Sequence, residues 1–315
     1  MHGVYATPWE IVEYLDISDG LTYLVNDSRI SRFALMMSRK FDTLIKRSFL
    51  PIRATYQYDF PTDEGSYNYI NTSGFPLFPN VLNLHRDLLS VITLTTSNGD
   101  TSIAADNIIL RTGYSSNYYP KDNIELTIDG DQTAFSYSGT PQNSQSVDGI
   151  WGYHEQYEDA WQSVDTVQDA GGINALVTTI TVVDADAFDE QGLKPRFQEQ
   201  QLLRLGSTDT SEMVYITGLN YSTNELTVIR GVNGSTAAIA AQNSVIEVFR
   251  PHEEINHALL ILSAHAYRRK DTVGKEADKN LFTNAGVLVI PQQIPQEVRD
   301  MVMAYKRPLG MISNG

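Results

Sequence analysis

The spacing of apolar residues changes twice along the chain, and this restricts the folds that the chain can adopt. Phe33, Met37 and Phe41 recur every fourth residue, which is typical of one side of an amphipathic helix. Residues 52–250 instead contain short runs of alternating apolar and polar residues between turns rich in Gly, Asn and Asp, which is typical of β-strands. The helical spacing returns in residues 251–315. Helices on both sides of a β-rich middle predict an α+β fold.

Two helices are expected at each end of the chain. Thr7, Pro8 and Glu10 form a capping-box pattern with proline at the first helical position, which predicts where the first helix begins. Pro51 is expected to follow the second helix, and Pro308 is expected to stop the last one. The expected helices span about residues 8–16, 28–49, 253–270 and 295–307.

The β-rich middle is expected to form strands joined by polar turns. These strands span about residues 53–60, 89–96, 123–128, 178–183, 200–206, 212–219, 225–229 and 244–249. Residues 133–147 are rich in Ser, Thr, Gln and Asn, which predicts a long loop. Trp151 and Trp161 lie beside polar loops, and a buried structural role is favoured over a contact role for each.

The helical segments are separated in sequence but need a common core. Amphipathic helices must bury their apolar sides, and these helices are expected to do so against one another, which joins residues 1–51 and 251–315 in one small helical bundle. Residues 52–250 would then be a large inserted barrel-like or sandwich-like region. This insertion forms either one domain or two subdomains, residues 52–150 and 151–250.

The chain is acidic, and its negative charge is concentrated in the middle. Of the net charge of −15, residues 51–150 contribute −7 and residues 151–250 contribute −9. Proteins that grip nucleic acid use clustered Lys and Arg, so no such role is expected. The chain has no run of 18 apolar residues, and residues 1–8 lack signal-peptide features, so neither a membrane span nor a secretion signal is expected.

The sequence lacks the familiar motifs of catalysis. It has no nucleophile elbow, no P-loop, no dinucleotide fingerprint and no cysteine. Asp184, Asp186 and Asp189 resemble part of a calcium loop, but the central Gly and the terminal Glu are missing, so a solvated acidic turn is favoured. The histidines lack the spacing of a helical metal pair. We therefore expect a protein that is not an enzyme, with no catalytic residue, cofactor or metal.

Several stretches of the chain carry a family resemblance. They are the second expected helix with the strand after Pro51, residues 291–308, residues 147–153 with Trp161 downstream, and residues 203–207 followed by residues 226–238. In these stretches and in its layout, the chain resembles the head–tail connector (adaptor) proteins of tailed bacteriophages. The resemblance implies a structural virion protein at the head–tail interface, assembled in the host cytoplasm.

The resemblance also implies a set of partners. Copies of the chain would form a dodecameric ring beneath the portal protein and would meet a stopper or tail-completion protein. Genomic DNA would pass through the ring without specific binding, and no membrane would take part. The alternative class is a β-rich carbohydrate-binding or glycoside-hydrolase-like tail or baseplate protein, because aromatic residues and acidic pairs such as Glu155 and Glu158 also suit sugars.

Two groups of residues are expected at interfaces. They are Arg29, Arg32, Arg39 and Lys40 on the second helix, and Leu309, Met311 and Ile312 after the last helix. The basic residues are expected to pair with carboxylates of a neighbouring protein. The three apolar residues of the tail are too few to form a core, so they are expected to dock on the portal or on a neighbouring copy.

Overall fold

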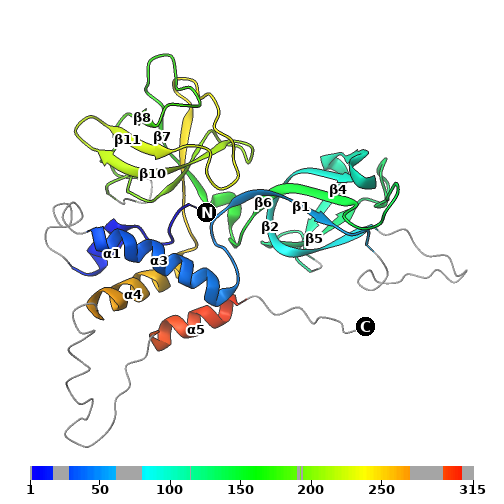
Figure 1. Ribbon diagram of the computed structural model, residues 1–315, viewed down its shortest axis with the longest axis horizontal. Coiled ribbons are helices and arrows are strands. Elements are labelled where there is room, and N and C mark those ends of the chain that lie inside the picture. Colours follow the sequence, from blue (N-terminus) through cyan, green and yellow to red (C-terminus); the bar gives the residue numbers. More distant parts are fainter. Residues whose placement is uncertain are drawn as a thin grey trace, which may run out of the picture.

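Helices and two antiparallel sheets occur together in the chain, so the expected α+β class is confirmed. The computed structural model describes residues 2–16, 28–61, 80–113, 115–189, 192, 194–269 and 294–306. In Figure 1 the helices gather in one part of the molecule, while one sheet lies above them and the other lies to their right.

The first two helices begin where their sequence signals lie. α1 (Pro8–Tyr14) starts with the expected capping box, in which the N–H of Glu10 donates to Thr7 Oγ1 at 3.2 Å and the N–H of Thr7 donates to the Glu10 carboxylate at 2.6 Å. α3 (Ser28–Ile45) ends four residues earlier than expected. The helix stops at Lys46, whose φ of 60° lies in the left-handed region that commonly closes helices.

The helices share their core with both sheets. α4 (Glu253–Arg269) and α5 (Gln296–Tyr305) lie close to their expected bounds and pack against α3, and α1 packs against α3 and α4. The same cluster of buried residues also includes Leu89 and Ile150 from the first sheet, and Leu202 and Phe249 from the second. The expectation that the helices bury their apolar sides only against one another is therefore wrong, because both sheets supply part of the cover.

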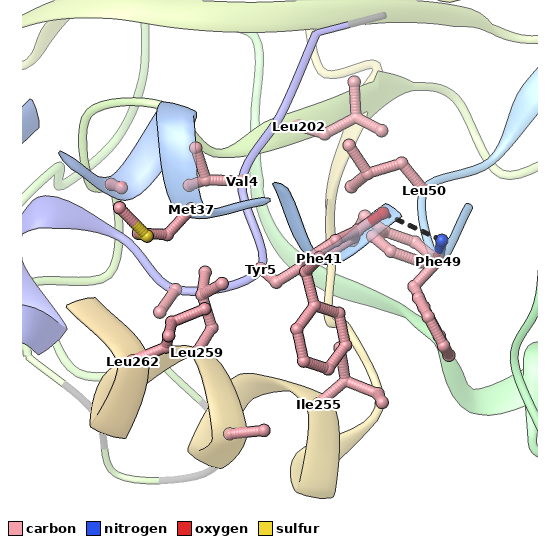
Figure 2. Packing of buried hydrophobic residues seen from close by; sticks show 14 of the residues in the cluster. Val4, Tyr5, Met37, Phe41, Phe49, Leu50, Leu202, Ile255, Leu259 and Leu262 are labelled. Carbon is pink, nitrogen blue, oxygen red and sulfur yellow. Dashed lines mark hydrogen bonds between the residues drawn. The ribbon is translucent and has the colours of Figure 1, made fainter. Parts of the chain in front are cut away.

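Figure 2 shows how this shared core is filled. Ile255, Leu259 and Leu262 project from α4 along one edge of the cluster, and Leu202 of the second sheet lies at the opposite edge. Phe41 of α3 lies between them and is fully buried, as its position in the apolar stripe predicts. Met37 is buried as well, whereas Phe33 is only partly buried against the cluster.

The first sheet is built from residues 52–151 and is antiparallel throughout. Its strands are β1 (Ile52–Tyr58), β2 (Val81–Thr96), β3 (Thr101–Ile103), β4 (Ile108–Arg111), β5 (Lys121–Leu126) and β6 (Gln145–Trp151). They lie in the order β1-β6-β2-β5-β4, with β3 paired to β2. β6, which begins within the expected loop, lies between β1 and β2. Gly149 fits this place because a Cβ there would come within 2.4 Å of the Ser90 carbonyl oxygen.

The second sheet is built from residues 161–249 and is also antiparallel. Its strands are β7 (Trp161–Thr166), β8 (Thr179–Thr181), β9 (Leu202–Leu205), β10 (Glu212–Asn220), β11 (Glu225–Ile229) and β12 (Val245–Phe249). They lie in the order β7-β12-β9-β10-β11-β8. All except β7 match strands expected from the sequence. β7 lacks a regular alternation of apolar and polar residues, so its pattern gave no strand signal.

Each sheet also has a hydrophobic cluster of its own. In the first sheet, Trp151 and Leu88 belong to this cluster, and Trp151 is 3% exposed, which confirms its expected burial. In the second sheet, the cluster is centred on fully buried residues such as Phe197 and Leu203. The chain passes from one sheet to the other between residues 151 and 161.

Candidate interaction site

A pair formed by the fully buried Tyr5 and the half-buried Asp42 fixes α3 against the start of the chain. The Tyr5 hydroxyl donates to the Asp42 carboxyl and accepts the backbone N–H of Phe49 at 2.9 Å, the bond drawn in Figure 2. Ser38 Oγ accepts the backbone N–H of Tyr5 at 3.2 Å. Burial raises the pKa of Asp42 to about 6 and raises the pKa of Tyr5. The pair holds α3 in one orientation and therefore determines which of its residues face outward.

α3 turns a mixed basic and apolar face to solvent. The four basic residues expected at an interface all lie on this helix, namely Arg29, Arg32, Arg39 and Lys40. Arg29 and Arg32 are exposed, whereas Lys40 is half-buried. The Arg39 guanidinium lies 3.6 Å from the Asp42 carboxyl, so this residue supports the core of its own chain. The structure thus places Arg29, Arg32 and Lys40 on the outward side of α3 and turns Arg39 toward the chain itself.

Two apolar residues on the same face were missed by the sequence analysis. Met36 is 57% exposed and Leu35 is 38% exposed. The available signal was the unbroken run of apolar residues 34–37, which is wider than one side of a helix buries. Leu309, Met311 and Ile312, expected to dock on a neighbour, lie outside the described residues.

An open cavity of about 420 Å³ lies between α1, the start of α4 and the second sheet. Its apolar lining comes from Val4, Leu50, Leu202, Phe249 and Leu260, and its acidic lining comes from Glu10, Glu13 and Glu253. Burial raises the pKa of Glu10, whose carboxylate accepts the bonds of the α1 capping box. Arg250 also lines the cavity, but its guanidinium donates to the Asp189 carboxylate. No sequence signal predicted this cavity, because segments far apart in the chain build it.

A set of polar contacts joins the segment after β6 to the segment before α4, and α5 to α4. The N–H of Gln156 donates to His154 Nδ1 at 3.1 Å, and His154 Nε2 lies 3.1 Å from the Arg250 carbonyl oxygen. The Tyr305 hydroxyl donates to the Glu254 carboxylate at 2.6 Å. Burial lowers the pKa of His154 to about 4, so its ring is neutral at neutral pH and Nε2 donates to the carbonyl oxygen. These contacts therefore hold the segment after β6, α4 and α5 together.

Of the residues considered for sugar or calcium binding, the two tryptophans and Asp189 are engaged within the protein, whereas Glu155, Glu158, Asp184 and Asp186 are exposed. Trp151 Nε1 donates to the Ala54 carbonyl oxygen at 2.8 Å. Trp161 packs against Phe249, with the Arg204 guanidinium 4.6 Å from the centre of its ring. Asp189 is buried with its carboxylate on Arg250, so the expectation of a solvated turn is wrong for Asp189, because an internal cation draws its side chain inward.

Searches for metal-binding clusters, for membrane-spanning helices and for known relatives each found nothing in what they covered. In the described ranges, no group of three or more His, Cys, Asp or Glu residues could hold a metal ion. None of the helices that the structure describes combines the length and the apolar character needed to cross a bilayer. No protein-family model matches the chain, and no curated protein matches it. The interaction surfaces are therefore assigned from their own geometry.

Proposed function

We propose that the chain is a structural virion protein, a head–tail adaptor that forms a dodecameric ring beneath the portal and joins the capsid to the tail. The observation that carries the proposal is the shared core, in which helices from both ends of the chain pack together and both sheets attach. An adaptor must contact its neighbouring copies and two different partners. A central core with two separate sheets around it (Figure 1) supplies distinct surfaces for these contacts.

In this proposal, residues 1–51 and 251–315 form the helical connector domain. The packing of α1, α3, α4 and α5 supports this assignment. Residues 52–250 are an insertion with two subdomains, residues 52–150 and 151–250, and the separate clusters of the two sheets support this division. Because both sheets contribute to the helical core, the inserted subdomains are held in a fixed orientation.

The partners follow from the same proposal. The ring binds the portal protein and a stopper or tail-completion protein, and genomic DNA passes through it without specific binding. The net charges of −7 and −9 in the two β-rich segments support free passage, because carboxylates repel phosphate. The protein is assembled in the host cytoplasm, resides in the virion, and acts as neither an enzyme nor a membrane protein. A sugar-binding role would have to use surface groups such as Glu155 and Glu158, because Trp151 and Trp161 pack within the protein.

Electron microscopy of negatively stained protein, alone and mixed with the portal protein of the same phage, tests the proposed function. Class averages should show closed rings, and rings stacked on portal when both proteins are present. A protein that stays monomeric and does not bind portal would contradict the proposal. A polysaccharide panel cleaved with turnover would favour the sugar-acting alternative instead.

A further inference from the structure

The outward face of α3 carries a regular stripe. Arg32, Met36 and Lys40 recur every fourth residue, so they lie along one side of the helix, and we call them the α3 stripe. Arg32 is exposed, Met36 is 57% exposed and Lys40 is half-buried. Leu35, which is 38% exposed, widens the apolar part of this face. An apolar centre between two cations is complementary to an apolar recess with carboxylates at its edge.

The cavity between α1 and α4 has this complementary character, and we call it the acidic pocket. Leu202 and Phe249 contribute to its apolar floor, while Glu13 and Glu253 occupy exposed positions at its edge. Its volume of about 420 Å³ lies within the range of roughly 300–1,000 Å³ that is typical of ligand pockets. The charge of Arg250 in its lining is already compensated by the Asp189 carboxylate, so the edge of the pocket attracts cations.

The α3 stripe and the acidic pocket lie on different sides of the helices. Among the described residues that line the pocket, none belongs to α3. The opposite side of α3, including Ala34, Met37 and Phe41, is packed into the shared core. Because side chains on one side of a helix cannot turn to the other, the stripe points away from the core and from the pocket of its own chain. Only another molecule can bring a stripe to this pocket.

We infer that the acidic pocket receives the α3 stripe of a second copy of this chain. Met36 enters over the apolar floor, where its flexible thioether adapts to the shape of the recess. Arg32 and Lys40 then lie against Glu13 and Glu253, and the charge-assisted pairs fix the direction of docking. This inference rests on the proposed function and names the surfaces that join neighbouring copies.

The proposed contact is heterologous, since the two surfaces differ. Every short chain of copies therefore keeps one open stripe at one end and one open pocket at the other, and growth continues until a ring closes. A contact between two identical surfaces would instead stop at a dimer. This difference makes the docking mode testable with variants that each lose one surface.

Two variants of the full chain separate the surfaces. The stripe variant carries Arg32→Glu and Met36→Asp, and the pocket variant carries Glu13→Lys and Glu253→Lys. All four positions are exposed, so both variants should keep the circular dichroism spectrum of the wild type. Lys46→Glu repeats the charge change of Arg32→Glu at an exposed position off the stripe, and Asp106→Lys with Asp131→Lys repeats the charge change of the pocket variant on the first sheet and its loop.

Light scattering and native mass spectrometry then report the assembly state. Each surface variant alone should lose self-association by about a hundredfold, because like charges now face each other, and both control variants should assemble as the wild type does. Mixing the stripe variant with the pocket variant should restore association with equal numbers of the two, since the unaltered stripe of one meets the unaltered pocket of the other and the reversed charges of the two altered surfaces also attract each other.

The outcomes distinguish this inference from the proposed function. If either surface variant forms rings as readily as the wild type, the docking assignment is wrong, while the adaptor function stands. Dimers formed by either variant alone would show a contact between identical surfaces and would also overturn it. A wild-type chain that stays monomeric with and without portal would overturn both the inference and the proposed function.

Discussion

The two sheets resemble each other in plan but are held together by different interactions. Both are antiparallel, and each has its own hydrophobic cluster. The second sheet contains nearly dry ion pairs, such as Arg230–Glu212, whose side chains are 5% and 2% exposed. The ion pairs described in the first sheet are more exposed to solvent. In the Arg111–Glu125 pair, for example, the two side chains are 31% and 26% exposed. The first sheet relies instead on Trp151, whose ring lies 4.8 Å from that of Tyr56.

The buried pair in the second sheet also organises its loops. Arg230 donates to the carbonyl oxygens of Asn174 at 2.9 Å, Val177 at 2.8 Å and Ala238 at 2.7 Å. The Glu212 carboxylate accepts the N–H groups of Gly231 and Ala238. A buried ion pair of this kind adds little net stability, but removal of one partner leaves the other charge buried without a counter-charge and out of reach of water. Charge removal should therefore damage the second sheet and spare the first.

Loss of a shared-core residue is expected to have the widest effect. Phe41→Ala removes a fully buried ring from the cluster that both sheets join, so the free energy of unfolding should fall by about 3–5 kcal/mol. Hydrogen exchange should become faster in both sheets. Faster exchange in one sheet alone would show that the sheets do not depend on a common core.

Glu212→Ala should cost a similar amount but act on the second sheet only. It leaves the buried Arg230 guanidinium without its carboxylate, which should lower the free energy of unfolding by about 3–5 kcal/mol in urea titrations. Replacing both partners with Glu212→Leu and Arg230→Met should recover much of this loss. A cost below about 1 kcal/mol for Glu212→Ala would contradict the described role of the pair.

Buried titratable groups in and around the shared core should give opposite pH dependences. The pKa of Asp42 rises from 3.8 to about 6, so between these values the folded chain holds a proton that the unfolded chain has lost, and stability falls as pH rises. The pKa of His154 falls from 6.5 to about 4, so in that window the unfolded chain binds the extra proton and stability rises with pH.

Single variants should separate these two contributions. Relative to the wild type, Asp42→Asn should become more stable by about 3 kcal/mol as pH rises from 4 to 6.5, because only the opposing dependence of His154 remains of the two. His154→Gln should show the reverse trend. Urea titrations at several pH values measure both, and parallel curves for the three proteins would contradict the assigned burial.

The smallest effect is expected for the wetter pair of the first sheet. Arg111→Ala removes a partner that water can replace, so the free energy of unfolding should change by less than about 1 kcal/mol. The same substitution at Arg230 serves as its matched counterpart in the second sheet. Equal losses at the two positions would remove the contrast between the sheets.

Much of the fold could be predicted from local patterns, and the rest depends on contacts between distant segments. The capping box at Thr7 and the stripe ending in Phe41 are local signals, and the structure confirms both. β6 was missed because its polar start resembles a loop, and its place is set by pairing with β1 and β2. The acidic pocket and the contribution of the two sheets to the shared core were missed for the same reason, since both depend on segments far apart in the chain.

The candidate interface could be predicted only in part. The basic residues of α3 are visible in the sequence, but their division between an outward surface and internal support is not. Asp42 decides this division, because its carboxyl lies within reach of both Arg39 and Tyr5. The spacing of Phe33, Met37 and Phe41 placed Met37 on the buried side of the helix, whereas the exposure of its neighbour Met36 became clear only in the structure.

Covalent trapping tests the central claim, assembly through two different surfaces, most directly. The chain has no cysteine, so Met36→Cys on the stripe and Tyr14→Cys at the pocket introduce the only thiols. After mild oxidation, denaturing electrophoresis of the double variant should show a ladder of covalent oligomers that extends beyond the dimer, while each single variant stays monomeric. A double variant without a ladder, or a Met36→Cys variant that alone gives covalent dimers, would contradict the account.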